Sequence, residues 1–248
     1  MIAVLVLWTA VAAGVAATGD RLAPLKLPFP HSVLGAFVNN LPLIAEAVWE
    51  TARGAFIGLL LGVAVGTAIG VAMAQWRVLE DAAYPYLVAA QMIPTIALAP
   101  IVLAIMKDPY ATKVAVAAYI SVFAVSLGTI KGLRSTPPDG LELMHTLHAR
   151  PIEVLVKLRV PAALPYFFAG LRIAAPLAVI GEIVVELAGS KDGLGTLLLV
   201  TQYYGGVANA HLFWAVMLVT LLLGYVFARS VTTIERLVAP WQPEFRRR

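Results

Sequence analysis

The chain has 248 residues, of which 60% are hydrophobic and 13% charged, and its formal net charge is +4. Long uncharged apolar runs at this composition exclude an ordinary soluble domain and indicate an all-α membrane protein with several spans. The sequence contains no cysteine, which excludes disulfides and thiolate metal sites.

The N-terminal region is predicted to hold one span and one interfacial helix. Residues 1–17 are apolar and uncharged. No basic segment precedes them as in a signal peptide, so we interpret them as a first transmembrane helix, although a span needs about 20 residues. After a Pro-rich loop over 18–30, residues 31–51 mix apolar residues with Asn39, Asn40, Glu46 and Glu50. This mixture favours a helix that lies in the membrane interface.

The second predicted span, residues 52–74, carries a glycine at every fourth position. Repeated small residues at this spacing allow a neighbouring helix to approach closely in lipid. Both simple helix packing and a sliding surface for conformational change fit this pattern. The glycines are Gly54, Gly58, Gly62, Gly66 and Gly70.

After a polar link over 75–84, a third span is predicted over 85–106 and a fourth over 111–130. The third contains Gln91, Pro94 and Pro100. Prolines inside a span leave backbone groups without partners, which is tolerated beside a neighbouring helix or a cavity. Gln91 with Pro94 is therefore a midspan candidate for lining a pathway, and a hydrogen bond from Gln91 to a neighbouring helix is the alternative.

The longest polar interruption of the chain runs from residue 139 to residue 165. Asp139 is predicted to cap a helix over 140–147, and residues 148–150 form the turn. Pro151 is predicted to begin a second helix and Pro161 to end it. His145 and His148 share a helix face, but no third ligand is apparent, so we predict a solvated or partner-contacting face and no metal.

The C-terminal half is predicted to hold a fifth span over 162–187, a loop over 188–195, a short surface helix over 196–209 and a sixth span over 210–228. Glu182 and Glu186 share a helix face near the far end of the fifth span. They are candidates for a pathway mouth or a contact with an external binding protein. Interfacial residues with water partners are the alternative.

The distribution of Lys and Arg predicts the orientation of the chain. Of the 18 basic residues, twelve fall on the side that contains residues 139–165 and the C-terminus. The positive-inside rule makes that side cytoplasmic and places both termini inside. The other side holds Arg21, Lys26, Arg53, Lys107, Lys113 and Lys191.

No signature of an enzyme is present in the sequence. There is no G-x-x-x-x-G-K-[ST] loop for nucleotide phosphates, and no local signature of a Ser-His-Asp set. We therefore expect no catalytic residues, no cofactor in this chain and no nucleic-acid partner.

Several motifs resemble the ABC-importer permeases of bacteria. Their EAA loop reads E-A-A, three residues, G, nine residues, I-x-L-P. Here Glu142-Leu143-Met144 stands for E-A-A, His148 for Gly, and Leu158-x-Val160-Pro161 for the end. The family Gly supplies a left-handed turn, which His tolerates better than most residues.

The resemblance covers residues 41–241, within a single permease domain over 1–248 that adds a first span and loop over 1–30. It is similar to the nitrate, sulfonate and taurine branch of these permeases. The runs that carry it are Gln91–Pro100, Gly132–Asp139, Leu158–Pro165, Gly170–Ala174 and Gly181–Gly195.

This resemblance implies a type I importer fold with about six transmembrane helices in the bacterial inner membrane. It also implies a second, identical permease subunit, an external substrate-binding protein and a cytoplasmic ATPase dimer that binds ATP and Mg²⁺. The cargo stays open among sulfonates, taurine, nitrate, bicarbonate and pyrimidine precursors. The residues that would couple to the ATPase are Glu142, Leu143, Met144, His148, Ala149, Leu158, Val160 and Pro161.

Two other classes of function compete with this hypothesis. A secondary transporter would need inverted repeats and midplane ion ligands, and the sequence shows neither. A non-transporting scaffold, or the passive half of a heterodimeric permease, stays possible because His148 replaces the Gly of the loop.

Overall fold

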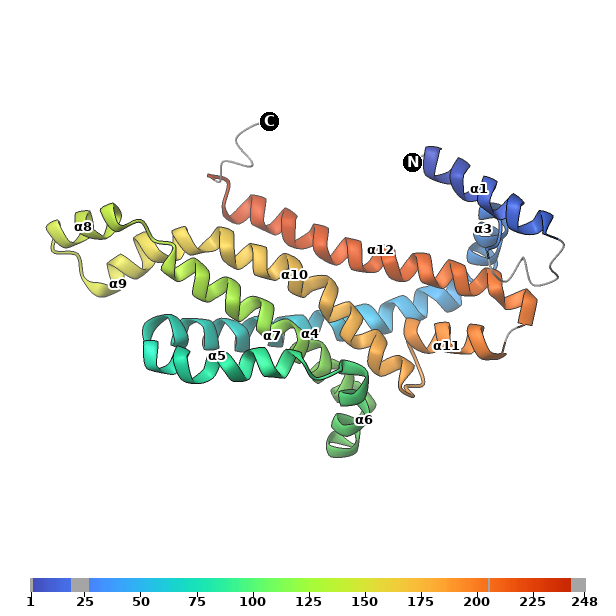
Figure 1. Ribbon diagram of the computed structural model, residues 1–248, viewed down its shortest axis with the longest axis horizontal. Coiled ribbons are helices and arrows are strands. Elements are labelled where there is room, and N and C mark those ends of the chain that lie inside the picture. Colours follow the sequence, from blue (N-terminus) through green and yellow to red (C-terminus); the bar gives the residue numbers. More distant parts are fainter. Residues whose placement is uncertain (1, 19–26, 205, 242–248) are drawn as a thin grey trace. The chain divides into compact units, whose positions relative to one another are not determined.

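The computed structural model describes residues 2–18, 27–204 and 206–241, and their regular structure is entirely helical (Figure 1). The chain divides into two compact units, residues 1–53 with 183–223 and residues 54–182 with 224–248. The divisions fall inside three long helices, α4 (Leu41–Gln75), α10 (Val160–Leu187) and α12 (Gly206–Val238).

Four helices in the described residues are long and apolar enough to cross a membrane. They are Leu41–Gln75, Pro109–Arg134, Pro151–Leu187 and Ala210–Val238, and a bent helix pair adds a fifth candidate. The predicted first span is helix α1 (Ile2–Ala17), whose 16 residues extend for about 24 Å. This is shorter than a hydrocarbon core of about 30 Å. The prediction of an all-α protein with several spans is confirmed.

The predicted third span is not one straight helix. It consists of α5 (Arg77–Gln91) and α6 (Thr95–Met106), which meet at an angle of 100°. The helix breaks immediately before Pro94, which has no N–H to continue the ladder. The predicted polar link over 75–84 is also wrong, because α5 already begins at Arg77 and carries Glu80 in its first turn, where the helix dipole favours an acid.

The predicted interfacial helix over 31–51 is two helices. Helix α3 (Pro30–Asn39) ends at Asn40, and α4 begins at Leu41 and continues for 35 residues. A helix of that length extends for about 52 Å, so its polar first turns fit outside a hydrocarbon core of about 30 Å. Glu46 and Glu50 therefore belong to the beginning of a long span.

Two further boundaries differ from the predictions. Helix α11 (Leu194–Tyr204) is shorter than the predicted surface helix over 196–209. Helix α12 begins at Gly206 and continues to Val238, past the predicted end of the sixth span at residue 228. Its later turns contain Arg229 and Glu235, and sequence hydropathy alone ended the span at these polar residues.

In the unit formed by residues 54–182 and 224–248, α4 packs closely against α7 (Pro109–Arg134). An ideal Cβ on Gly62 would lie 2.5 Å from the Cβ of Ser121 and 2.9 Å from the carbonyl oxygen of Ala118. The constant sequence offset between contacting residues shows that the two helices run parallel. The pairs are Gly58 with Ala117, Gly62 with Ser121, Gly66 with Val125, and Gly70 with Thr129.

Helix α10 packs against α7 in the opposite direction in the same unit. An ideal Cβ on Gly170 would lie 2.5 Å from the carbonyl oxygen of Ala124, and one on Gly132 would lie 2.7 Å from that of Ala163. Helix α12 is tied to α10 by an ion pair of 3.2 Å between Arg172 and the fully buried Glu235. Helix α10 therefore contacts α7 through its backbone and is held to α12 by an ion pair.

The α4–α7 contact gives the first prediction. Gly62→Ala adds a methyl group where there is no space, which costs about 1–3 kcal/mol, whereas Gly224→Ala adds the same group where no atom lies within 4 Å. We expect Gly62→Ala to lower the melting temperature in detergent and Gly224→Ala to leave it unchanged or raise it, because Ala favours helix over Gly. Equal melting temperatures for the two variants would contradict the packing.

Candidate functional site

The polar segment forms a helical hairpin between α7 and α10 (Figure 1). Helix α8 (Pro138–Thr146) and helix α9 (Pro151–Val154) are its two arms. The predicted cap at Asp139 is wrong, because the helix begins at Pro138, two residues before the predicted start at 140, and has no side-chain cap. The second arm begins at Pro151 as predicted.

Pro161 does not end the second arm. A π-helical turn over Leu155–Arg159 leads directly into α10, which begins at Val160. A wider turn just before a proline absorbs the hydrogen bond that its missing N–H cannot make. The second arm of the hairpin is therefore continuous with a membrane span, and displacement of one moves the other.

His148 closes the hairpin turn in the left-handed conformation, with φ 51°. The Ala149 N–H donates to the Met144 carbonyl at 3.0 Å, and the His148 N–H donates to the His145 carbonyl at 3.0 Å. These are the two hydrogen bonds of a Schellman motif, which usually has Gly at this position. The first turn of α9 is secured by Glu153, whose carboxylate accepts from the Arg150 N–H at 3.0 Å and pairs with Lys157 at 3.1 Å.

The hairpin exposes large apolar side chains despite its polar composition. Leu143 on α8 and Leu147, which follows its last residue, lie four residues apart and are 59% and 66% exposed. Ile152 on α9 and Val156 in the π-helical turn are also four residues apart and are 60% and 57% exposed. Exposed apolar side chains on a polar segment are typical of a surface that a protein partner or a membrane covers.

The structure places the predicted coupling residues along this hairpin. Glu142, His148 and Val160 are exposed, whereas Met144, Ala149 and Pro161 are half-buried. Leu158 lies beside Gly140, where an ideal Cβ would be 3.1 Å from its Cδ1 atom, and so holds the two arms together.

Gln91 lies in a groove between α5, α7 and α10. The groove has a cavity volume of 450 Å³ and is lined by apolar residues together with Gln91, Lys131 and Tyr166. A second hollow of 530 Å³ shares Lys131 and Tyr166 and extends to Arg134, which donates to Glu80 at 2.7 Å. The two hollows are therefore neighbours, and both are lined by polar as well as apolar side chains. Pro94 lies outside the lining, at the break between α5 and α6.

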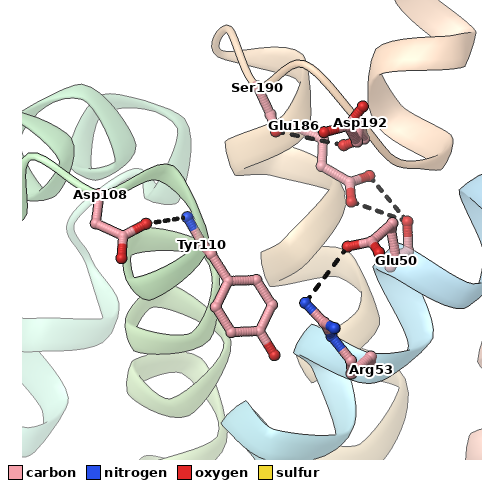
Figure 2. A network of polar contacts seen from close by, with 8 residues as sticks. Glu50, Arg53, Asp108, Tyr110, Glu186, Ser190 and Asp192 are labelled. Atoms are coloured by element: carbon pink, nitrogen blue, oxygen red, sulfur yellow. Dashed lines mark hydrogen bonds and ion pairs between the residues drawn. The ribbon is translucent and has the colours of Figure 1, made fainter.

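Glu182 and Glu186 are both fully buried. Glu182 occupies the space left by Gly54, where an ideal Cβ would lie 2.1 Å from its Oε1 atom. Figure 2 shows the Glu186 side chain directed toward the part of α4 that carries Glu50 and Arg53. Glu186 accepts a hydrogen bond from the Thr51 hydroxyl at 2.9 Å and another from the Gly195 N–H at 2.7 Å.

Sequence reasoning missed the residues that surround these predicted positions. Nothing in the sequence pairs Thr51 with Glu186, 135 residues apart, or places Lys131 and Tyr166 beside Gln91. The one available signal was the run Gly193-Leu194-Gly195, whose two glycines indicate a close approach of backbone to another group.

The fold and the hairpin define a class of protein. The described residues form parallel and antiparallel spans, with a helical hairpin that exposes apolar side chains between two of them, and so define a multi-span membrane protein. Residues 58–240 match the family described as the binding-protein-dependent transport system inner membrane component. The chain belongs to this family.

Relatives and solved structures agree with this assignment. The chain is 37% identical to a formylaminopyrimidine transport permease of Halalkalibacterium halodurans, covering 88% of this chain and 87% of the relative. It is 32% identical to a riboflavin transport system permease of Chloroflexus aurantiacus, covering 87% and 80%. A nitrate import permease of Synechococcus elongatus is 24% identical, covering 87% and 81%, which supports the predicted nitrate branch.

The fold is also similar to that of a solved importer. The inward-facing MetNI methionine ABC transporter superposes with a TM-score of 0.67 at 21% identity, covering 80% of this chain and 97% of that one. This similarity confirms the predicted type I permease fold.

The groove gives a second prediction. The sequence contains no native cysteine, so a single introduced cysteine is labelled without background. A Gln91→Cys variant reacts with a membrane-impermeant maleimide in everted vesicles or detergent, because Gln91 is exposed in a groove whose polar side chains need water. The control Val125→Cys stays unlabelled, because Val125 is fully buried. Equal labelling of both positions would contradict a specific water-filled groove at Gln91.

Proposed function

We propose that this permease carries a small solute, delivered by an external binding protein, across the bacterial inner membrane. A separate ATPase dimer drives the transport and docks on the hairpin formed by α8, α9 and the turn between them. Two copies of the permease enclose the pathway, and the groove that contains Gln91, Lys131 and Tyr166 faces it. The family membership supports the class, and the hairpin supports the point of coupling.

The observation that carries the proposal is the exposed apolar surface of the hairpin. Leu143, Leu147, Ile152 and Val156 are each more than half exposed, and a soluble partner that buries them gains hydrophobic free energy. The excess of Lys and Arg on the same side supports a cytoplasmic location. Because α9 is continuous with α10 through the π-helical turn, force on the hairpin reaches a span directly.

Alternating access in an ATP-driven importer requires that the ATPase bind the two arrangements of the permease with different affinities. ATP shifts the permease between arrangements only if the ATPase binds one hairpin position better than the other. No comparison supports a secondary transporter or a non-transporting scaffold. His148 also closes a complete Schellman turn, so its replacement of the family Gly leaves the hairpin geometry intact.

The coupling proposal is tested by copurification. Leu147→Glu places a charge in the buried centre of the proposed interface, and we expect the amount of ATPase that copurifies to fall by about tenfold or more. His145→Ala, an exposed change on the same helix, serves as the control and retains the ATPase. Retention of the ATPase by Leu147→Glu would show that it docks elsewhere.

The turn itself is tested by substitutions at position 148. His148→Gly keeps or improves transport-coupled ATPase turnover, because Gly adopts a positive φ without strain. His148→Val lowers turnover, because a β-branched residue is a genuine outlier there. Glu142→Ala tests a second predicted coupling residue, on helix α8 before the turn. If none of the three changes turnover, the assignment of the hairpin as the coupling element is wrong.

We further infer that the cargo is a small nitrogen heterocycle. The two named relatives above 30% identity transport formylaminopyrimidine and riboflavin, whereas the nitrate relative is 24% identical and a bicarbonate relative 27%. A mostly apolar groove with one amide, one phenol and one ammonium group, from Gln91, Tyr166 and Lys131, suits a flat ring with hydrogen-bonding groups.

The cargo is tested on the binding protein that docks to the complex. Mass spectrometry of the protein purified without added ligand is expected to detect a bound heterocycle, and a thermal shift with pyrimidine and flavin compounds is expected to exceed that with nitrate or taurine. A shift with nitrate or taurine alone would refute this cargo and leave the transport proposal standing.

A further inference from the structure

Glu186 and Thr51 together cap the N-terminus of α11. Leu194 and Gly195 are the first two residues of that helix, and their N–H groups have no acceptor within it. The Gly195 N–H donates to Glu186 Oε2 at 2.7 Å, and the Leu194 N–H donates to the Thr51 hydroxyl oxygen at 2.9 Å. The Thr51 hydroxyl in turn donates to Glu186, so one buried network satisfies both amides.

The backbone around this cap leaves space for the carboxylate. Gly193 has φ 115°, and an ideal Cβ there would lie 1.9 Å from Glu186 Oε1. An ideal Cβ on Gly195 would lie 2.7 Å from the Glu186 Cβ atom. Carboxylates are favoured at a helix N-terminus, and hydrogen bonds to an ionised group are stronger than neutral ones. The start of α11 is therefore fixed to α10 and α4 by hydrogen bonds as well as by packing.

Between Glu186 and α11 the chain forms a short loop, residues 188–192, whose tip is exposed although the chain is buried before and after it. Ala188, Gly189, Lys191 and Asp192 are exposed, whereas Glu186 before them and residues 193–195 after them are buried. The tip borders a groove of 320 Å³ whose lining also includes Glu46 and Glu50 of α4. Figure 2 shows Ser190 and Asp192 in the loop beyond Glu186, with Glu50 on the facing helix. The hydrogen-bonded cap at Glu186 and Thr51 thus supports a short charged loop, which lies beside this groove.

Chain topology decides which partner this loop meets. The hairpin over 139–165 and the loop over 188–192 are separated by one membrane crossing, the helix that ends at Leu187. If the hairpin docks a cytoplasmic ATPase, the loop lies on the external side, where the binding protein arrives. This step rests on the proposed function.

We propose that Glu186 and Thr51 are positioning residues for docking of the external binding protein. Both side chains are fully buried and act through the loop over 188–192, whose shape they fix. The loop and the adjoining groove are the surface that the binding protein contacts. Loss of the cap weakens docking and leaves the transport cycle of the docked complex intact.

The test uses the complete importer in lipid nanodiscs, with ATPase rate measured against the concentration of its purified binding protein. For Glu186→Gln, which removes the charge and one acceptor, we expect the half-saturating concentration to rise about tenfold. The maximal rate at saturating binding protein stays within about twofold of wild type, since Glu186 is fully buried and lines neither the groove at Gln91 nor the hairpin.

A matched pair at position 51 separates the hydroxyl from the shape of the side chain. Thr51→Val removes the hydrogen bonds and repeats the effect of Glu186→Gln, whereas Thr51→Ser keeps them and behaves as wild type. Thr220→Val is the control, because the Thr220 hydroxyl donates to the Val216 carbonyl one turn before it, at 2.9 Å, within its own helix. Hydrogen–deuterium exchange at Leu194 and Gly195 reports the cap directly and is expected to accelerate in Glu186→Gln and Thr51→Val.

The outcomes separate this inference from the function on which it rests. If the wild-type complex contains no ATPase, or no binding protein stimulates it, the proposed function fails. If wild type is stimulated and exchange at Leu194 accelerates in Glu186→Gln with an unchanged half-saturating concentration, the positioning role is refuted. A fall in maximal rate without a change in half-saturating concentration also refutes it, because that result indicates a role in the cycle and not in docking.

Discussion

Backbone contact between α4 and α7 is the constraint on which the membrane core of this permease depends. Helices in lipid gain little from hydrophobic burial, so their association rests on close van der Waals contact. Glycine at every fourth position of α4 lets its backbone meet α7 along four successive turns. Because α10 also contacts α7 through Gly128 and Gly170, α7 becomes the central helix of its unit, and the hairpin that follows it begins from a fixed support.

The hairpin and the span after it form one mechanical element. Helix α9, the π-helical turn and α10 are continuous, and the buried Glu235 holds α10 to α12 through Arg172. A π turn in this position accommodates Pro161 without a break, so the arm proposed to dock the ATPase stays joined to the span that follows it. The exposed apolar pairs on the hairpin lie at the far end of that element and give a partner a hydrophobic surface to hold.

The buried acids show how polar groups are accommodated elsewhere in the chain. Glu186 is satisfied by backbone N–H and hydroxyl donors, and Glu182 lies in space provided by Gly54. Ionisable groups this deeply buried are costly unless they are paired or hydrogen-bonded. Their position at the end of a span drew attention to them in the sequence, and the structure shows one of them organising the loop that follows.

The sequence by itself determined the helical membrane class, the approximate spans, the glycine stripe of α4, the hairpin with its left-handed turn at His148 and the family. These features depend on local periodicity, composition and short motifs, which one segment carries alone. Only the tertiary structure decided the 100° bend between α5 and α6, the continuity through Pro161, the burial of Glu186 and its pairing with Thr51, and the groove around Gln91. The pairing of Glu186 with Thr51 and the groove around Gln91 depend on which residues far apart in the chain come together. The bend and the continuity through Pro161 depend on whether a helix breaks or widens at a proline, and the sequence allows both.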